Sequence, residues 1–214
     1  MPPHILFQDK HLLVINKPSG LSTELEKHGY LSVEQWARDS FPDSYVGIAH
    51  RLDRPTSGVL VLALKKSVLS HLQKQFENKS VKKIYKTLIN KGIKPTSGRL
   101  ENLLYKDNSI QKALIVAADA VNSQTKQAIL HYKKTDWASP LYDELEIELE
   151  TGRYHQIRAQ LSHHGFPVVG DTKYGSAEPY SPAAGIALHA YSLSFEHPVL
   201  SKILTYTCPP SWSL

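Results

Sequence analysis

Short apolar runs along the chain predict buried strands. Residues 12–15 and 59–64 are continuously apolar, have the length of strands and are bounded by turn-forming residues. At residues 144–150, leucine and isoleucine alternate with glutamate, so this segment is predicted to be a strand with one solvent-facing side. Two further segments, residues 81–90 and 186–200, are also typical of strands.

Apolar residues at helical spacing predict three helices. The first follows Ser32, a typical N-cap residue, and the second follows Ser67. The third follows a Thr-Gly corner and ends at Gly165 and Pro167. The residues expected to face the core are Val33, Trp36 and Ala37 in the first helix, Leu69, Leu72 and Phe76 in the second, and Ile157 and Leu161 in the third.

The order of these elements predicts the fold class. Strands outnumber helices and mostly follow one another by hairpins, so we expect an α+β fold built on a large mixed, mainly antiparallel sheet flanked by helices. Residues 90–109 are rich in turn formers and are predicted to be loops and short strands. No repeat or long linker divides the chain, so residues 1–214 are expected to form a single bilobed domain.

Composition narrows the class of protein. The 214 residues carry a formal charge of +5, which favours a polyanionic partner such as nucleic acid. Cys208 is the only cysteine, so an internal disulfide is impossible and a reducing compartment is expected. No signal peptide is recognisable, and no apolar run approaches the roughly 20 residues that span a bilayer. We therefore expect a cytoplasmic protein without a membrane partner.

A polar run, "HRLDRPTSG", directly precedes the second apolar strand and places Asp53 between Arg51 and Arg54. One interpretation is an ordinary surface turn, in which such an ion pair is worth about 0–1 kcal/mol. The other is a reactive carboxylate, kept ionised by an arginine of the third predicted helix, where Arg153 and Arg158 lie. An ionised and partly desolvated aspartate is a nucleophile or a base.

Motifs for metals and nucleotide cofactors are absent from the sequence. His155, His163 and His164 lack the HExxH spacing, there is no cysteine pair, and there is no phosphate-binding glycine loop. We therefore expect no metal and no cofactor. A metal-dependent nuclease that uses Asp53 and Asp171 is kept as an alternative, which would require clustered carboxylates.

Aromatic and basic residues allow two interpretations. Tyr85 lies among lysines on a predicted strand, where it is either a packing residue or a platform on which a nucleobase stacks. Three lysine pairs fit contacts to phosphates, and they fit solvated ends of strands and helices equally well. These pairs are Lys65–Lys66, Lys82–Lys83 and Lys133–Lys134.

Six sequence blocks resemble the RluA-type pseudouridine synthases. The segment "HRLDRPTSGVLVLALKK" is similar to the catalytic motif of that family, in which H-R-L-D is followed by T-S-G. The other blocks follow in the family's order, so that the resemblance covers roughly residues 8–198. They are "NKPSGL", "KKIYK", "TGRYHQIR", "GFPVVGDTKYG" and "LHAYSLSFEHP".

The resemblance implies roles for individual residues. Asp53 is expected to be the catalytic carboxylate, Arg158 its ion-pair partner and Tyr85 the aromatic residue that stacks on the base or accepts a proton. Arg51 is expected to fill the gap that a flipped nucleotide leaves. The remaining matched residues, expected to bind substrate, are His50, Arg54, Arg153, His155 and Gln156.

The resemblance also implies the activity and the partner. We expect a monomeric, cofactor-independent enzyme that isomerises uridine to pseudouridine in a structured tRNA or rRNA. Leu130 stands where the family commonly has threonine, which affects a local loop contact only. No small RNA-binding appendage is recognisable in the sequence, so recognition is expected to rest on the catalytic domain. The alternative is a non-catalytic RNA-binding module or RNA chaperone on the same scaffold.

Overall fold

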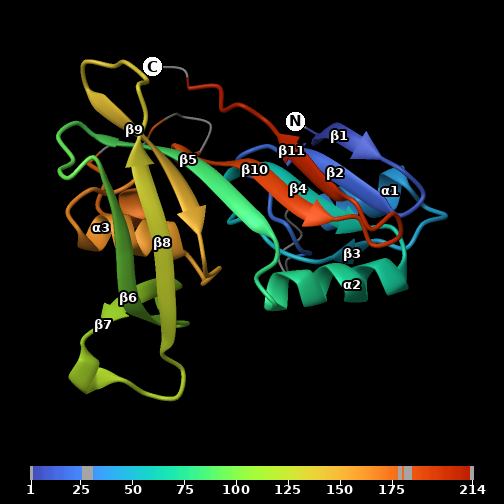
Figure 1. Ribbon diagram of the computed structural model, residues 1–214, viewed down its shortest axis with the longest axis horizontal. Helices are drawn as coiled ribbons and strands as arrows, with labels where there is room; N and C mark the ends of the chain where they lie inside the picture. The colour runs from blue at the N-terminus through green and yellow to red at the C-terminus, as the bar shows by residue number, and fades with distance from the viewer. Residues whose placement is uncertain (1, 26–30, 178–179, 181–184, 213–214) are drawn as a thin grey trace. The chain divides into compact units, whose positions relative to one another are not determined.

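The computed structural model describes residues 2–25, 31–177, 180 and 185–212 (Figure 1). The chain divides into two compact units. The first comprises residues 1–84, 183–185 and 189–214, and the second comprises residues 85–182 and 186–188. Each unit has its own strands, helices and hydrophobic core. The predicted α+β class is confirmed, because helices flank strands that pair mainly antiparallel.

The sheet of the first unit is built around two apolar strands. Strand β4 lies between β2 and β10, pairing antiparallel with β2 and parallel with β10. Strand β1 continues the sheet beyond β2, β11 pairs with β10, and β3 pairs with part of β4. The bounds are β1 His4–Gln8, β2 Leu12–Lys17, β3 Gly47–Ile48, β4 Ser57–Ala63, β10 Leu188–Glu196 and β11 Ile203–Thr207.

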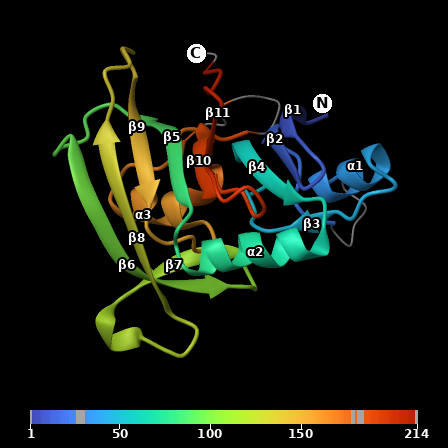
Figure 2. The same cartoon turned by 45° about the vertical axis from the view of Figure 1, so that its right-hand side comes forward.

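Two helices accompany this sheet. Helix α1 (Val33–Ser40) begins as predicted, because the Ser32 hydroxyl accepts a hydrogen bond from the Gln35 amide. Helix α2 (Lys66–Glu77) runs beside β3 and β4, as Figures 1 and 2 show, and buries Val68 and Leu72. This helix was predicted to follow Ser67, but it already begins at Lys66. The residue at its N-cap position is Lys65, whose side chain makes no capping hydrogen bond.

The second unit contains a sheet in the order β5–β9–β8–β6–β7, with helix α3 packed against it. Ile157 and Leu161 of α3 join the core that the strands form, as their spacing predicted. Two short 3-10 turns, Ala118–Ala120 and Thr172–Tyr174, complete this unit. The bounds are β5 Lys82–Asn90, β6 Ser97–Asp107, β7 Lys112–Val116, β8 Lys126–Lys134, β9 Tyr142–Leu149 and α3 Gln156–His163.

Two expectations for the second unit were wrong. Residues 90–109 were predicted to be loops and short strands, but they include β6, an 11-residue strand. Strand β6 pairs with β8 on one side and β7 on the other, so neighbouring strands stabilise a segment of weak apolar pattern. Glu144, expected on a solvent-facing side, is buried, where its carboxylate contacts Lys86 Nζ and Thr135 Oγ1, each at 3.0 Å.

Among the described residues, no helix has both the length and the apolar character needed to cross a membrane.

Candidate active site

Asp53 lies in the loop that joins β3 to β4, in the first unit. Its side chain is half-buried, whereas Leu52 beside it is buried. The Thr56 amide donates a hydrogen bond to the Asp53 carbonyl oxygen at 3.0 Å, which closes a tight turn. Strand β4 begins at Ser57, directly after this turn. A rigid buried strand therefore anchors the loop that carries the carboxylate.

Residues 17–23, which overlap the end of β2, hold the main chain of this loop. Their side chains and backbone bond to residues 52–55 at several successive positions. These residues belong to the "NKPSGL" block and its extension, to which the sequence assigned no role. The bonds join Ser19 Oγ to Pro55 O at 2.7 Å, Gly20 N to Arg54 O at 2.8 Å, and Thr23 Oγ1 to Leu52 O and N at 2.8 and 3.2 Å.

Lys17 is fully buried beneath the loop, with 0% of its surface exposed. Its ammonium donates to the carbonyl oxygens of Pro18, Leu21 and Arg54, at 3.1, 2.7 and 3.3 Å. Burial lowers the pKa of this ammonium to about 7, while attraction to the Asp53 carboxylate acts in the opposite direction. Sequence reasoning missed Lys17, although it stands in a block that the resemblance had singled out.

The two arginines that flank Asp53 point to different partners. The Arg51 side chain is 61% exposed, and its Nη1 lies 2.7 Å from the Glu24 carboxylate. The Arg54 Nε donates to the Gly20 carbonyl oxygen at 3.1 Å, so this side chain adds to the bonds that hold the loop. The predicted contacts of both arginines with substrate remain predictions.

His50 is engaged in packing at the start of the loop. Its Nε2 accepts a hydrogen bond from the Val61 amide at 3.2 Å, and its ring stacks on Phe76 with centroids 4.5 Å apart. Burial, with a smaller contribution from Lys83, lowers the pKa of His50 to about 3. These contacts give His50 a structural role, and its predicted role in substrate binding remains a prediction.

In the second unit, Gln156 organises the turn between β9 and α3. Its Oε1 accepts hydrogen bonds from Thr151 Oγ1 at 2.8 Å and from the Arg153 amide at 3.0 Å. Its Nε2 donates to the Ile129 carbonyl oxygen at 3.0 Å. The Arg153 side chain is exposed and its Nε donates to the Gln127 carbonyl oxygen at 2.9 Å. Gln156 therefore shapes the start of α3 from a buried position.

His155 precedes α3 in a left-handed conformation, with φ of 50°. Its ring stacks on Tyr154 with centroids 3.8 Å apart, and its Nδ1 lies 2.9 Å from the Tyr174 hydroxyl. Burial, followed by the charge of Arg158, lowers the pKa of His155 to about 3. His155 is therefore neutral at physiological pH, within a cluster of aromatic rings.

Arg158 has a partner that sequence reasoning missed. Its Nε and Nη2 donate to the two carboxylate oxygens of Asp171, at 2.6 and 2.9 Å, and both side chains are almost completely buried. The guanidinium also lies over the Tyr174 ring, 5.0 Å from its centroid. The signal in the sequence was the "GFPVVGDTKYG" block, which contains both Asp171 and Tyr174.

Tyr85 lies in β5 and is half-buried at the margin of the core of the second unit. The structure thus supports a packing contribution for this ring, and its predicted contact with a base remains a prediction. Apart from Tyr85, the predicted residues lie in two short segments of the sequence, and the structure places each segment in one unit. His50, Arg51, Asp53 and Arg54 share the loop before β4, and Arg153, His155, Gln156 and Arg158 share the start of α3.

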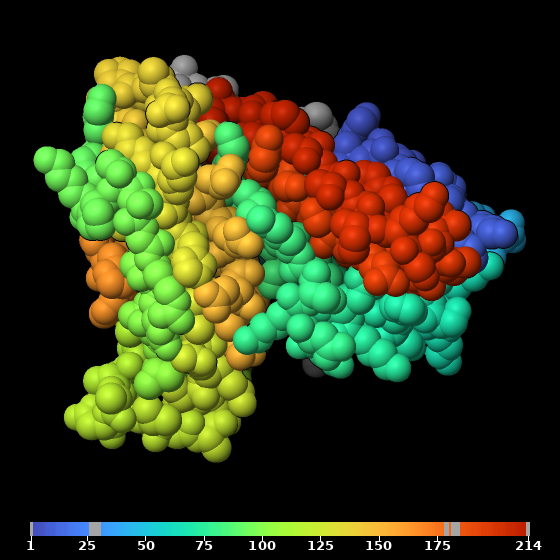
Figure 3. Space-filling model, viewed as in Figure 1, coloured from blue at the N-terminus to red at the C-terminus, as the bar shows by residue number. Residues whose placement is uncertain are grey.

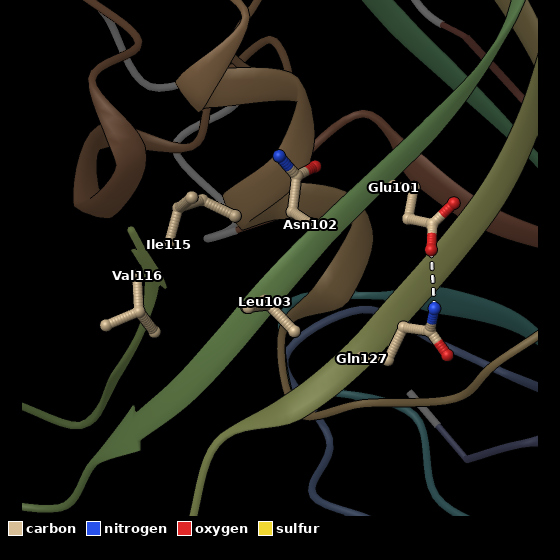
Figure 4. Close-up of a pocket in the computed structure, with 6 residues that line it drawn as sticks. All are labelled: Glu101, Asn102, Leu103, Ile115, Val116 and Gln127. Atoms are coloured by element: carbon tan, nitrogen blue, oxygen red, sulfur yellow. Dashed lines mark hydrogen bonds between the residues drawn. The ribbon is translucent and has the colours of Figure 1, made fainter. Parts of the chain in front are cut away.

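Two further observations concern other kinds of site. Within the described ranges, no three histidine, cysteine or acidic side chains are placed to hold a metal ion. An open hollow of about 380 Å³ lies on β6, β7 and β8 and contains none of the predicted site residues (Figure 4). It is lined by Glu101, Asn102, Leu103, Ile115, Val116 and Gln127, and Glu101 and Gln127 are joined by a hydrogen bond.

A family model described as RNA pseudouridylate synthase matches residues 11–163, which include Asp53, Tyr85 and Arg158. The chain belongs to this family. It is 33% identical over 223 residues to the tRNA pseudouridine synthase C of Pectobacterium carotovorum subsp. carotovorum, covering 94% of this chain and 57% of that protein. The RluA-type resemblance is thereby confirmed.

Another RNA pseudouridylate synthase is similar over most of both chains. The dual-specificity RNA pseudouridine synthase RluA of Escherichia coli O157:H7 is 32% identical over 209 residues, covering 96% of this chain and 92% of that protein. The solved structure of human RNA Pseudouridylate Synthase Domain Containing 1 has a TM-score of 0.80 at 23% identity, covering 97% and 83% of the two chains. It confirms the fold. The chain spans only 57–66% of the length of three curated relatives, including the Pectobacterium protein.

Proposed function

We propose that this chain isomerises specific uridines in structured tRNA or rRNA to pseudouridine, with Asp53 as the catalytic carboxylate. The observation that carries the proposal is that residues 17–23, which include the buried Lys17, hold the Asp53 loop through hydrogen bonds. A catalytic carboxylate must be held in one position against its substrate, and this loop is bonded at successive residues. An ordinary surface turn has no need of such support.

The reaction requires few chemical groups. The bond between uracil N1 and the ribose breaks, the base rotates, and the ribose rejoins at carbon 5, where a hydrogen is lost while N1 gains one. No atoms are added or removed overall, so the chemistry needs no donor or oxidant. Asp53 either attacks the anomeric carbon or removes a neighbouring ribose proton. Both routes need an ionised carboxylate, and Lys17 beneath the loop favours that form when its amine is protonated.

Arg158 is the proposed ion-pair partner of Asp53. A guanidinium carries five N–H donors, and its side-on pair with Asp171 uses one donor on Nε and one on Nη2. Asp171 has the role of fixing the orientation of Arg158, and the Tyr174 ring limits its movement from one side. A fixed guanidinium is already oriented for the carboxylate and loses little entropy on pairing.

The remaining residues act on the RNA. Tyr85 stacks on the uracil face or accepts the proton that leaves carbon 5. The target base must leave its stack, which costs a few kcal/mol, and Arg51 partly offsets this cost by filling the vacated place. Arg51 is suited to the role because its side chain is exposed and paired only at the surface with Glu24.

The test is replacement of Asp53 by asparagine, which preserves size but can neither attack nor act as a base. We expect Asp53→Asn to fold and bind RNA, and to release no tritium from RNA that contains 5-tritiated uridine. Asp43→Asn, at an exposed position in another loop, is the matched control and is expected to behave as wild type. Mapping pseudouridines in total tRNA and rRNA of cells that lack the protein identifies the target.

Two outcomes would contradict the proposal. Tritium release by Asp53→Asn at the wild-type rate would remove Asp53 from the catalytic role. If the wild-type protein binds tRNA or rRNA tightly but releases no tritium, and no pseudouridine is lost from cells that lack it, the chain is an RNA-binding module instead.

A further inference from the structure

Two partly buried hydrogen bonds meet at His189, at the point where the Asp53 loop enters β4. The Ser57 hydroxyl oxygen is 2.8 Å from Nδ1 of His189 in β10, and His189 Nε2 is 2.8 Å from the Cys208 carbonyl oxygen. Only 4% of the surface of His189 is exposed. Ser57 and His189 are 132 positions apart in sequence, so this contact exists only in the folded protein.

The chemistry of the partners fixes the position of each proton. A carbonyl oxygen can only accept, so His189 Nε2 carries the hydrogen that is donated to Cys208. Burial lowers the pKa of His189 to about 4, so the ring is neutral at physiological pH and its Nδ1 is an acceptor. The Ser57 hydroxyl therefore donates to Nδ1. Each atom in the two hydrogen bonds is therefore either a donor or an acceptor. Neither bond can form with donor and acceptor exchanged.

Strands β4 and β10 approach each other closely beside these two hydrogen bonds. Strands β4 and β10 pair in parallel at two positions, Ser57 with His189 and Gly58 with Ala190. Gly58 has φ of 117°, and a Cβ atom there would lie 2.3 Å from the Ala190 carbonyl oxygen. A shift at His189 is therefore transmitted to Ser57, which directly follows the turn closed between Thr56 and Asp53.

We propose that His189 is a positioning residue that holds the Asp53 loop through its hydrogen bond from Ser57. This inference rests on the function proposed above. The hydrogen bond to Cys208 instead attaches the segment after β11 to β10. The Cys208 amide makes a second contact with β10, because it donates to the Tyr191 carbonyl oxygen at 2.9 Å. Figure 3 shows the C-terminal residues, in red, over the first unit beside the N-terminal strands, in blue. His189 thus serves the loop through Nδ1 and the C-terminal segment through Nε2.

Two substitutions separate the two bonds. In His189→Asn, the amide oxygen lies near the position of Nδ1 and can still accept from Ser57, while the bond to Cys208 is lost. In His189→Gln, the amide nitrogen reaches toward the position of Nε2 and can still donate to Cys208, while the acceptor for Ser57 is lost. Both variants remove one partly buried hydrogen bond and the same imidazole ring, so both are expected to lower the melting temperature similarly.

Turnover is expected to differ between them. We expect His189→Gln to lower kcat by about 10- to 100-fold with little change in KM, because small misplacement of a reacting group is costly. His189→Asn is expected to retain most of the wild-type kcat. The matched control is His197→Asn. His197 is fully buried, directly follows β10 and bonds to Asp9, and this variant is expected to lose stability without losing turnover.

A second measurement does not depend on activity. Hydrogen exchange of the peptide that spans residues 51–57 is expected to be faster in His189→Gln than in wild type, and unchanged in His189→Asn. If the two variants have equal kcat and equal exchange rates, His189 is only a core residue and the proposal is wrong. If kcat falls only in His189→Asn, the hydrogen bond to Cys208 is the one that matters, which also contradicts the proposal. If wild type forms no pseudouridine, the proposed function fails, and the exchange measurement still decides whether His189 positions the loop.

Discussion

Lys17 illustrates how a charged residue serves structure at a candidate active site. Among the described residues it is the largest side chain that is completely buried. Burying an ammonium is costly unless hydrogen bonds replace its hydration, and here carbonyl oxygens of three residues do so. Two of them, those of Leu21 and Arg54, belong to the two segments that meet at the loop. The residue therefore joins these segments at the position where Asp53 must be held.

The corresponding prediction is that Lys17→Met destabilises the protein. Methionine fills the same space but leaves the carbonyl oxygens without donors, so the free energy of unfolding in urea is expected to fall by about 1–3 kcal/mol. Lys91→Met is the matched control, since the Lys91 ammonium also donates to a carbonyl oxygen, that of Ser139 at 2.9 Å, but is exposed. The control is expected to change stability by no more than about 0.5 kcal/mol. Equal effects of the two substitutions would contradict the role given to Lys17.

Among the elements, α3 is unusual because the residues that begin it are both buried and polar. Gln156 and Arg158 are each no more than 4% exposed, and each has hydrogen-bond partners. Only part of this helix is a conventional apolar face, formed by Ile157 and Leu161. Buried polar groups specify one arrangement only when they are satisfied, and this arrangement fixes the orientation of Arg158.

The buried ion pair of α3 is predicted to matter for both stability and activity. Arg158→Ala leaves the buried Asp171 carboxylate without its partner, so we expect a loss of about 3–5 kcal/mol in unfolding free energy together with loss of tritium release. Arg38→Ala, which breaks the ion pair with Glu34 on helix α1, is the control and should cost about 0–1 kcal/mol, because Arg38 is half-exposed. If Arg158→Ala keeps nearly wild-type stability and turnover, the buried ion pair contributes to neither of them.

For the whole molecule, buried histidines predict how stability depends on pH. Burial lowers the pKa of His50 and His155 to about 3 and that of His189 to about 4, whereas in the unfolded chain each titrates near 6.5. Between these values the unfolded state binds more protons, so the unfolding free energy is highest above pH 6.5 and falls as the pH is lowered toward 4. Urea unfolding at pH 7.5, 6.5, 5.5 and 4.5 measures this slope.

A variant serves as the control for this pH profile. His189→Asn lacks one of the depressed groups, so its stability should fall less steeply than that of wild type between pH 6.5 and 4.5. Carboxylates with lowered pKa values, such as Asp143, lose their contribution mainly below pH 4 and do not disturb this range. A flat profile in wild type would show that these histidines become protonated without unfolding.

Much of the molecule was predictable from local patterns in the sequence. The apolar runs at 12–15 and 59–64 lie in β2 and β4, and α1 begins after Ser32 as its capping residue indicated. The spacing of apolar residues in a strand or helix and the capping of a helix depend only on residues close together in the sequence. Both can therefore be predicted from the sequence. The motif around Asp53 also identified the loop, since the residues that define it are contiguous.

The tertiary structure alone decided the features that join distant segments. Strand β6 has a weak apolar pattern, and its length comes from pairing with β7 and β8. Lys17 bonds to a residue 37 positions away, and His189 to one 132 positions away. A sequence specifies which groups must find partners when buried, because unpaired polar groups are costly, but many partners satisfy that need equally well. Only the packed chain determines that Asp171 pairs with Arg158 and that Ser57 donates to His189.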